Sequence, residues 1–355
     1  MKIRKLAVLL TAAALTAAAA TGCTGGKETE AVAAGAGTGT ETGTTAESMA
    51  AGTAAEESSE EETADSMAAE DEENYDTGDA SKDNTRNQDG IGEDELLVVS
   101  FGTSYNDSRR LTIGAIEDAV EKAFPDFAVR RGFTSQIIID HVKSRDNVAI
   151  DNVGEALDRA EKNGVRNLVI QPTHLMNGLE YTDLVNEAAE YSDAFDKVAI
   201  GKPLLTTEDD FRAVMKAVTE ATAQYDDGET AICFMGHGTE AQANQVYRKL
   251  QEMFLAAGQE NYFIGTVEAE PALEEVLAQV KKGSYKRAVL QPLMIVAGDH
   301  ANNDMAGEEE GSWKQAFEEA GYEVSCILRG LGELEKIRQL FVKHAKEAES
   351  CLLAV

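Results

Sequence analysis

Cysteine and basic side chains are both scarce in this sequence. Its 355 residues include four cysteines, none in a CxxC pair, and these are too few and too scattered for a disulfide scaffold. The sequence has only 32 lysines and arginines against 64 acidic residues. The resulting net charge of −32 argues against a general nucleic-acid binder. GxGxxG, P-loop and GxSxG motifs are absent as well, which argues against a nucleotide cofactor and against a serine hydrolase.

The first 23 residues have the pattern of an export signal. Lys2, Arg4 and Lys5 precede the apolar stretch LAVLLTAAALTAAAA, and small residues lead up to Cys23. This ending resembles the lipobox of bacterial lipoproteins, in which the cysteine is lipidated, although Ala20 stands where leucine is commonest. We therefore expect an extracytoplasmic lipoprotein, anchored to the membrane through Cys23. Ordinary secretion and an uncleaved anchor are the alternatives.

Residues 24–94 form an acidic stretch dominated by Ala, Gly, Thr, Ser, Glu and Asp. Because it holds almost no large apolar side chain, it cannot bury enough surface to offset its chain entropy. The acidic run 56–73 repels itself and favours an extended chain. We predict a disordered linker that holds a domain away from the membrane. An acidic metal-collecting arm is the alternative.

From residue 95 onward, short apolar runs alternate with stretches of helical periodicity. The predicted strands are 96–101, 127–133, 167–172, 197–203, 230–235, 262–267, 287–292 and 322–328. The predicted helices are 112–124, 153–163, 179–191, 241–256, 271–281, 313–320 and 333–348. Strands that alternate with helices indicate an α/β fold with parallel sheets.

The second half of this region repeats the plan of the first. Phe101-Gly102-Thr103 matches His237-Gly238-Thr239, and VIQP at 169–172 matches VLQP at 289–292. Two matches in the same order indicate an internal duplication. We therefore predict two similar lobes, 95–205 and 206–355, each with a parallel sheet flanked by helices. A ligand cleft is expected at the carboxyl ends of the strands.

Candidate metal ligands follow the predicted strands of the second lobe. His237 lies between two glycines after one strand, Glu268 follows the next, and His300 lies in the loop after a third. Two imidazoles and one carboxylate from neighbouring strand ends can form a three-ligand site that leaves positions open for a substrate. Asp299 and Asp304 can orient His300 or serve as turn residues.

The other three histidines are weaker candidates. His141 and His344 lie in polar, helix-like sequence and are expected to be surface or capping residues. His174 follows the predicted strand 167–172, where it either lines the cleft or has a structural role.

Six long stretches carry a family resemblance: LLVVSFGTSYNDSRRLTIGAIE (96–117), AFPDFAVRRGFTSQIII (123–139), QPTHLMNGLEY (171–181), FMGHGTEAQANQVY (234–247), GTVEAEP (265–271) and LQPLMIVAGDHANNDMAGEEEGSW (290–313). They resemble the class II tetrapyrrole chelatases, and among these the anaerobic sirohydrochlorin cobaltochelatases of the CbiK type. The resemblance covers residues 95–353 and none of 1–94. It implies two facing α/β lobes that insert Co²⁺ into sirohydrochlorin, or a precorrin relative, without ATP during anaerobic cobalamin biosynthesis.

The resemblance also implies roles for individual residues. The family's His, Glu and His metal ligands fall on His237, Glu268 and His300, and we assign proton acceptance to His237 as well. Such a ligand set also accepts Fe²⁺, Ni²⁺ or Zn²⁺. Because the substrate carries many carboxylates, we expect polar and positive groups beside the cleft, although exposed helix or strand positions explain the arginines equally well. The candidates are Ser104, Arg109 and His174, with Arg110, Arg130 and Arg131 as further arginines.

The export signal raises a second interpretation, since cobalamin biosynthesis runs in the cytoplasm. An extracytoplasmic lipoprotein that binds haem, another tetrapyrrole or a metal could supply an importer. A metal buffer without a tetrapyrrole partner is a third interpretation. Tight stoichiometric binding without turnover would favour the second, and catalytic metallation would favour the chelatase. The oligomeric state stays open, with a homo-oligomer among the options.

Overall fold

The computed structural model of the chain describes residues 77–353. The predicted export signal, the lipidation site Cys23 and most of the acidic stretch therefore lie outside the described residues. Between residues 77 and 353, none of the helices combines the length and the apolar character that crossing a bilayer requires.

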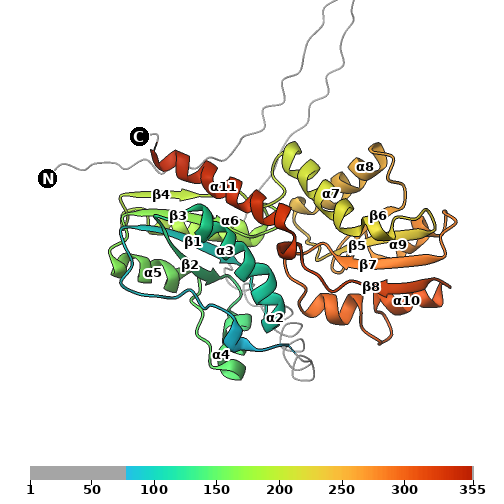
Figure 1. The fold of residues 1–355 in the computed structure, drawn as a ribbon, viewed down its shortest axis with the longest axis horizontal. Helices are drawn as coiled ribbons and strands as arrows, with labels where there is room; N and C mark the ends of the chain where they lie inside the picture. The colour runs from blue at the N-terminus through green and yellow to red at the C-terminus, as the bar shows by residue number, and fades with distance from the viewer. Residues whose placement is uncertain (1–76, 354–355) are drawn as a thin grey trace, which may run out of the picture. The chain divides into compact units, whose positions relative to one another are not determined.

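Two parallel four-stranded sheets form the centre of the described chain (Figure 1). The first has the order β2-β1-β3-β4 and the second the order β6-β5-β7-β8, so the two lobes share one topology. The strands are β1 (Asp94–Ser100), β2 (Ala128–Phe133), β3 (Asn167–Pro172), β4 (Lys197–Ile200), β5 (Thr230–Gly236), β6 (Tyr262–Thr266), β7 (Arg287–Pro292) and β8 (Glu323–Cys326). The register agrees too, because Val99 pairs with Pro172 and Met235 pairs with Pro292. The predicted duplication and fold class are confirmed.

Helices connect the strands and cover the sheets (Figure 1). They are α2 (Asn106–Arg109), α3 (Ala115–Ala123), α4 (Gln136–Asp146), α5 (Val153–Asn163), α6 (Leu179–Glu190), α7 (Glu208–Thr222), α8 (Gln245–Ala256), α9 (Leu273–Val280), α10 (Trp313–Glu319) and α11 (Glu335–Leu353). Two π-helical turns occur, at Arg110–Gly114 and Ala301–Met305. The sequence patterns did not predict α4 or α7. Helix α7 begins at a capping box in which Thr207 and Asp210 satisfy each other's backbone amides.

Successive residues of a strand point to opposite faces of the sheet, and in β1 both faces are buried. In β1, Leu96 and Val98 belong to a core cluster shared by the two lobes. Leu97 and Val99 belong to a separate cluster with α5 and α6. A strand covered on both faces reads as a continuous apolar run, which is the pattern in the sequence.

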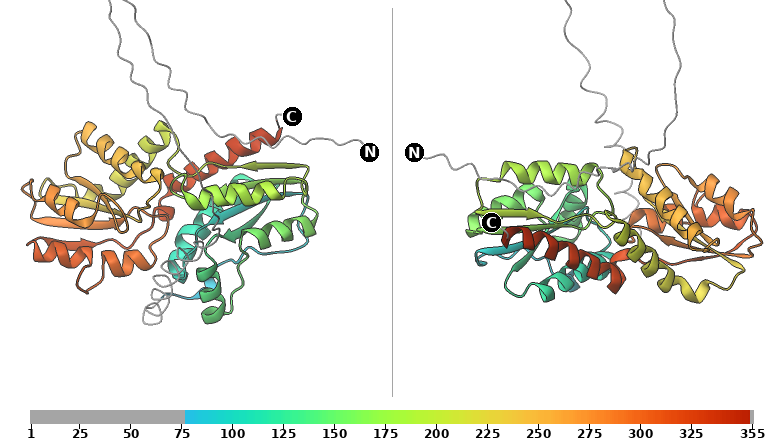
Figure 2. Two further views of the ribbon diagram at one scale, coloured as in Figure 1. Left: turned by 180° about the vertical axis from the view of Figure 1, so that it is seen from behind. Right: turned by 90° about the horizontal axis from the view of Figure 1, so that it is seen from above.

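The last helix, α11, packs on the first lobe rather than the second. It contacts β3, β4 and α3, as well as α7, and the views of Figure 2 show it lying along the first sheet. The predicted boundary, which assigned all of 206–355 to the second lobe, is therefore wrong for this helix. His344 of α11 was expected at the surface, but it is buried (1% exposed) with Nε2 3.1 Å from an Asp210 oxygen.

Residues 77–93, which we call the strap, pack on the first lobe ahead of β1. Asp83 of the strap forms ion pairs with Arg109 and Arg131 at 2.8 and 2.7 Å. Arg86 is buried beside Glu117, at 3.3 Å. The prediction of a disordered linker extending to residue 94 is therefore wrong for the strap, because buried ion pairs fix its side chains.

Candidate metal centre

Three neighbouring strands of the second sheet deliver the predicted metal ligands to one edge. His237 follows β5 directly, Glu268 lies two residues after β6, and His300 lies in the loop after β7 and precedes the π-helical turn Ala301–Met305. Since β6, β5 and β7 are adjacent and parallel, their carboxyl ends meet at the same place.

Two glycines allow the backbone around His237 to pack closely. A Cβ on Gly236 would lie 2.2 Å from the Tyr247 ring, so only glycine fits between β5 and α8. Gly238 has φ +98, a conformation that side chains disfavour, and a Cβ there would lie 2.8 Å from the Ala269 amide nitrogen. The close packing places the His237 ring beside the segment that carries Glu268.

The three side chains converge closely enough to bind one ion. One ligand atom from each of His237, Glu268 and His300 lies within 4.8 Å of the others. The His237 Nδ1 and Glu268 Oε2 atoms are 3.4 Å apart, and the two imidazole rings meet edge to face with centroids 4.7 Å apart. Ligand bonds of about 2.0–2.2 Å to a divalent ion fit this spacing after small side-chain adjustments.

The centre is open on one side. The side chains of His237 and Glu268 are 45% and 54% exposed, so an ion bound between them can be reached by a substrate. His237 Nδ1 lies 3.0 Å from the Gly238 carbonyl oxygen. A neutral ring with its proton on Nδ1 donates to that carbonyl and leaves Nε2 as the ligand atom.

His300 has a carboxylate partner that orients it. Its Nδ1 lies 2.8 Å from an Asp304 oxygen, which keeps the proton on Nδ1 and leaves Nε2 free for a metal. Partial burial opposes a charge on the ring, but the hydrogen bond and charge of Asp304, helped by Glu268 and Asp299, outweigh it and raise the pKa of His300. Asp299 accepts a hydrogen bond from Asn303 Nδ2 at 2.7 Å.

Most of the arginines predicted to contact substrate have another role. Arg109, Arg130 and Arg131 are fully buried, so the expectation that they are exposed or line the cleft is wrong. Arg109 donates to Asp83, Thr103 and Asn106. Buried arginine requires such carboxylate and carbonyl partners, because an unpaired charge would cost several kcal/mol. These side chains stabilise the first lobe and cannot contact a substrate directly.

Ser104, His174 and Arg110 lie apart from the metal ligands in the sequence and belong to the first lobe. The Ser104 side chain is only 3% exposed, which does not support a direct contact with substrate. Arg110 pairs with Asp107 at 3.1 Å. Both ring nitrogens of His174 are buried without a partner among residues 77–353, and burial lowers its pKa to about 4. A role for this neutral imidazole in substrate binding stays a prediction.

Tyr247 is a site residue that the sequence patterns did not identify. Its ring is 1% exposed, its hydroxyl lies 3.4 Å from the Gly238 amide nitrogen, and burial raises its pKa to about 12. It supports the backbone that carries His237. A tyrosine on an amphipathic helix reads as an ordinary core residue, so no local signal pointed to this position.

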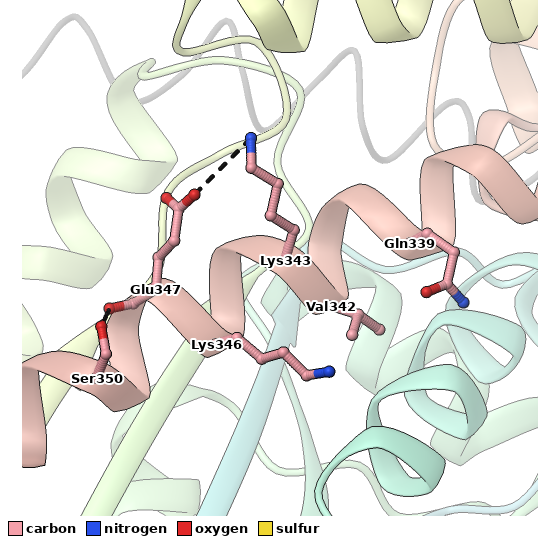
Figure 3. Close-up of a pocket in the computed structure, with 6 residues that line it drawn as sticks. All are labelled: Gln339, Val342, Lys343, Lys346, Glu347 and Ser350. Atoms are coloured by element: carbon pink, nitrogen blue, oxygen red, sulfur yellow. Dashed lines mark hydrogen bonds and ion pairs between the residues drawn. The ribbon is translucent and has the colours of Figure 1, made fainter.

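A pocket elsewhere on the molecule is unrelated to this chemistry. It lies on α11 and is lined by Gln339, Val342, Lys343, Lys346, Glu347 and Ser350 (Figure 3). All six residues come from one helix surface, where Lys343 pairs with Glu347 at 3.8 Å. None of them is a candidate metal ligand.

The chain is similar to known proteins over most of its length. A family described as cobalt chelatase (CbiK) matches residues 94–350. The chain is 36% identical over 253 residues to the sirohydrochlorin cobaltochelatase of Salmonella typhimurium, covering 71% of this chain and 95% of that protein. It is 30% identical over 259 residues to the sirohydrochlorin cobaltochelatase CbiKC of Nitratidesulfovibrio vulgaris, covering 72% and 91%.

Among solved structures, SirB from Bacillus subtilis with Fe³⁺ has a TM-score of 0.49 at 13% identity, covering 72% of this chain and 96% of that one. The family match spans most of the chain, and the curated relatives are covered almost completely. The chain therefore belongs to the CbiK family of cobalt chelatases.

Proposed function

We propose that the protein inserts Co²⁺ into sirohydrochlorin without a nucleotide cofactor. The observation that carries the proposal is the open centre formed by His237, Glu268 and His300, whose ligand atoms lie within 4.8 Å of one another. The names of the two curated relatives support sirohydrochlorin as the substrate. Both the ion and the macrocycle are substrates of this reaction.

The residue types suit the two tasks of metal insertion. The ion must be held before transfer, and two pyrrole N–H protons must leave the macrocycle as the ion enters. Glu268 supplies negative charge that offsets part of the ion's charge, while the two imidazoles bind as neutral ligands. His237 is the more exposed histidine, and an imidazole that releases the ion has a free ring nitrogen that can accept a proton.

The choice of Co²⁺ rests on the family rather than on the donor set. Two imidazoles and a carboxylate also suit Fe²⁺, Ni²⁺ and Zn²⁺, so availability and the shape of the open side decide between them. A panel of these ions, each offered with sirohydrochlorin, tests the assignment.

The location of the reaction is a further part of the proposal. The positively charged start, the apolar stretch and the small residues before Cys23 support an extracytoplasmic enzyme anchored to the membrane by a lipid. Replacing Cys23 with serine should move the protein from the membrane fraction to the soluble fraction. An unchanged distribution would argue against the lipid anchor.

The test of activity follows the tetrapyrrole absorption spectrum after the purified protein is mixed with sirohydrochlorin and Co²⁺. His237→Ala and His300→Ala should each lose most of the insertion rate, because either change removes a metal ligand. His141→Ala is the matched control, since His141 lies on α4 outside the centre. Near wild-type rates in both ligand variants would refute the proposed site. Tight binding of the tetrapyrrole without turnover in the unaltered protein would refute the proposed reaction.

A further inference from the structure

The loop that carries His300 rests on the first lobe. The Ala297 amide donates to Ser108 Oγ across 3.0 Å, which joins this loop directly to α2. A Cβ on Gly298 would lie 3.0 Å from Thr103 Oγ1, so the two loops are in close contact. Val296 packs against an apolar cluster of the first lobe that includes Phe133. These three loop residues precede His300 by two to four positions, so the first lobe helps to fix its backbone.

The contacting residues of the first lobe are themselves held by Arg109. This side chain is completely buried, and its Nη1 donates to the Thr103 carbonyl at 3.1 Å. Its Nη2 donates to the Asn106 side chain at the start of α2. Helix α2 continues without a break into the π-helical turn Arg110–Gly114 and α3, and the contacts of Arg109 hold its first turn, which carries Ser108.

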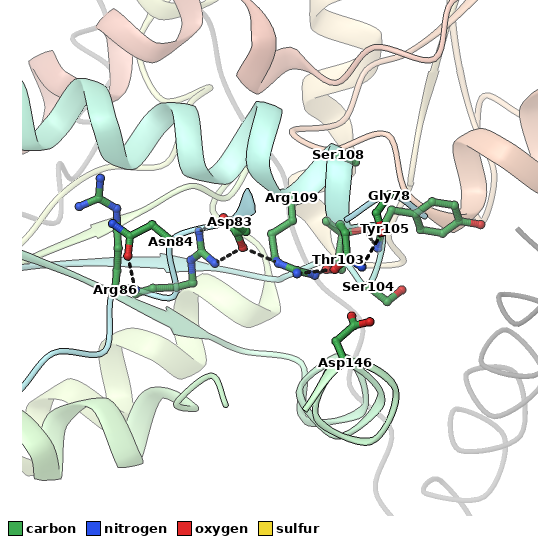
Figure 4. A network of polar contacts seen from close by, with 12 residues as sticks. Gly78, Asp83, Asn84, Arg86, Thr103, Ser104, Tyr105, Ser108, Arg109 and Asp146 are labelled. Atoms are coloured by element: carbon green, nitrogen blue, oxygen red, sulfur yellow. Dashed lines mark hydrogen bonds and ion pairs between the residues drawn. The ribbon is translucent and has the colours of Figure 1, made fainter. Parts of the chain in front are cut away.

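Arg109 is in turn fixed by the strap. Its Nε donates to Asp83 at 2.8 Å, and Figure 4 shows Asp83, Arg109 and Thr103 joined in sequence by polar contacts. The strap reaches α2 a second time, because the Asp107 amide donates to the Thr77 carbonyl at 2.9 Å. Asp83 is 3% exposed, so water does not screen its charge from the guanidinium.

We propose that Ser108, Arg109 and Asp83 are positioning residues for His300. The strap thereby acts on metal insertion without touching the ion or the macrocycle: Asp83 holds Arg109, Arg109 holds the Thr103 loop and α2, and Ser108 holds the loop that ends at His300. This inference rests on the proposed function and assigns to the ordered segment before β1 a part in the reaction.

The decisive experiment compares Ser108→Ala with Ser108→Thr, which keeps the hydroxyl. Ser108 is only partly buried, so both variants are expected to fold. Ser108→Ala should weaken Co²⁺ binding and lower kcat by about threefold to tenfold, the size expected for one hydrogen bond. It should also change the visible absorption bands of bound Co²⁺, with little change in the KM for sirohydrochlorin. Ser108→Thr should restore all of these. Ser144→Ala, which removes an exposed serine hydroxyl from α4, is the matched control.

The result that overturns the inference is a folded Ser108→Ala protein with the wild-type Co²⁺ spectrum, affinity and kcat. Equal losses in Ser108→Thr would also overturn it, because the hydroxyl would then not be the cause. Asp83→Asn adds a test of the strap: if the variant folds, it should show the same spectral change as Ser108→Ala. If it does not fold, the comparison of Ser108→Ala with Ser108→Thr tests the proposal by itself. Absence of cobalt insertion by the unaltered protein would instead refute the proposed function.

Discussion

Replacing Asp304 with asparagine removes one charge beside the metal centre while keeping the size of the side chain. The Asp304 carboxylate lies 2.8 Å from His300 Nδ1 and fixes both the ring orientation and the proton position. Loss of such a partner typically costs a metal site 10- to 100-fold in affinity. Because the two side chains are 31% and 44% exposed, we expect the lower end, about tenfold or about 1.4 kcal/mol.

The same substitution should weaken Co²⁺ binding and yet make that binding less sensitive to acid. In the unaltered protein Asp304 raises the pKa of His300 against the effect of burial. A metal ion competes with the proton, so Co²⁺ binding weakens as the pH falls through this raised pKa. Asp304→Asn lowers the pKa, and the midpoint of the binding curve should move to lower pH. The variant should therefore bind Co²⁺ more weakly near pH 8 and yet resist acidification better.

Calorimetric titration with Co²⁺ at a series of pH values measures both effects. Glu309→Gln is the matched control, since it removes an exposed charge from the same loop region without a contact to His300. The control should keep the wild-type affinity and midpoint. Identical affinity and midpoint in Asp304→Asn would show that Asp304 does not orient His300, and the account of the centre would be wrong.

Three further predictions concern stability. Gly236→Ala places a Cβ 2.2 Å from a buried tyrosine ring, so urea denaturation should show a loss of about 1–3 kcal/mol, whereas Gly92→Ala, in open space, should not. Burial raises the pKa of Glu95 to about 7 from its ordinary 4.5. The folded protein then binds the proton more tightly than the unfolded chain. As the pH rises from 4.5 to about 7, the free energy of unfolding should therefore fall by up to about 1.4 kcal/mol per pH unit. Glu95→Gln should flatten that slope, and an unchanged slope would refute the assignment. Asp83→Asn leaves two buried guanidinium groups short of a carboxylate and should lower the unfolding free energy by about 3–5 kcal/mol, while Asp89→Asn on the exposed surface should cost under about 1 kcal/mol.

Local patterns in the sequence were sufficient to predict the strands and the convergence of the three candidate metal ligands. Strands such as β3 and β7 are buried on both faces, so each appears as a short apolar run followed by Gln-Pro. The ligands could be predicted because parallel strands place their carboxyl ends at one edge, where His237 and Glu268 must lie near each other. The motifs shared with the CbiK family pointed to the same residues.

The roles of the charged residues could not be predicted in this way. Arg131 lies within β2, and a charged strand residue is expected to be exposed. It is buried because Asp83 and Glu117, 48 and 14 positions away, both pair with it. His344 is buried because Asp210 lies beside it although the two are 134 positions apart. Residues that pair across such separations produce no periodic pattern in the sequence, so their burial could not be predicted from it.

The sequence was sufficient to predict the order of the strands, most of the helices, the repeated plan of the two lobes and the candidate metal ligands, since each depends on residues close together or on a strand end. It was not sufficient to predict that the strap and α11 pack on the first lobe, or that Ser108 contacts the loop of His300. Both depend on contacts between residues far apart in the sequence and on the pairing of buried charges. Such contacts form only when the whole chain packs.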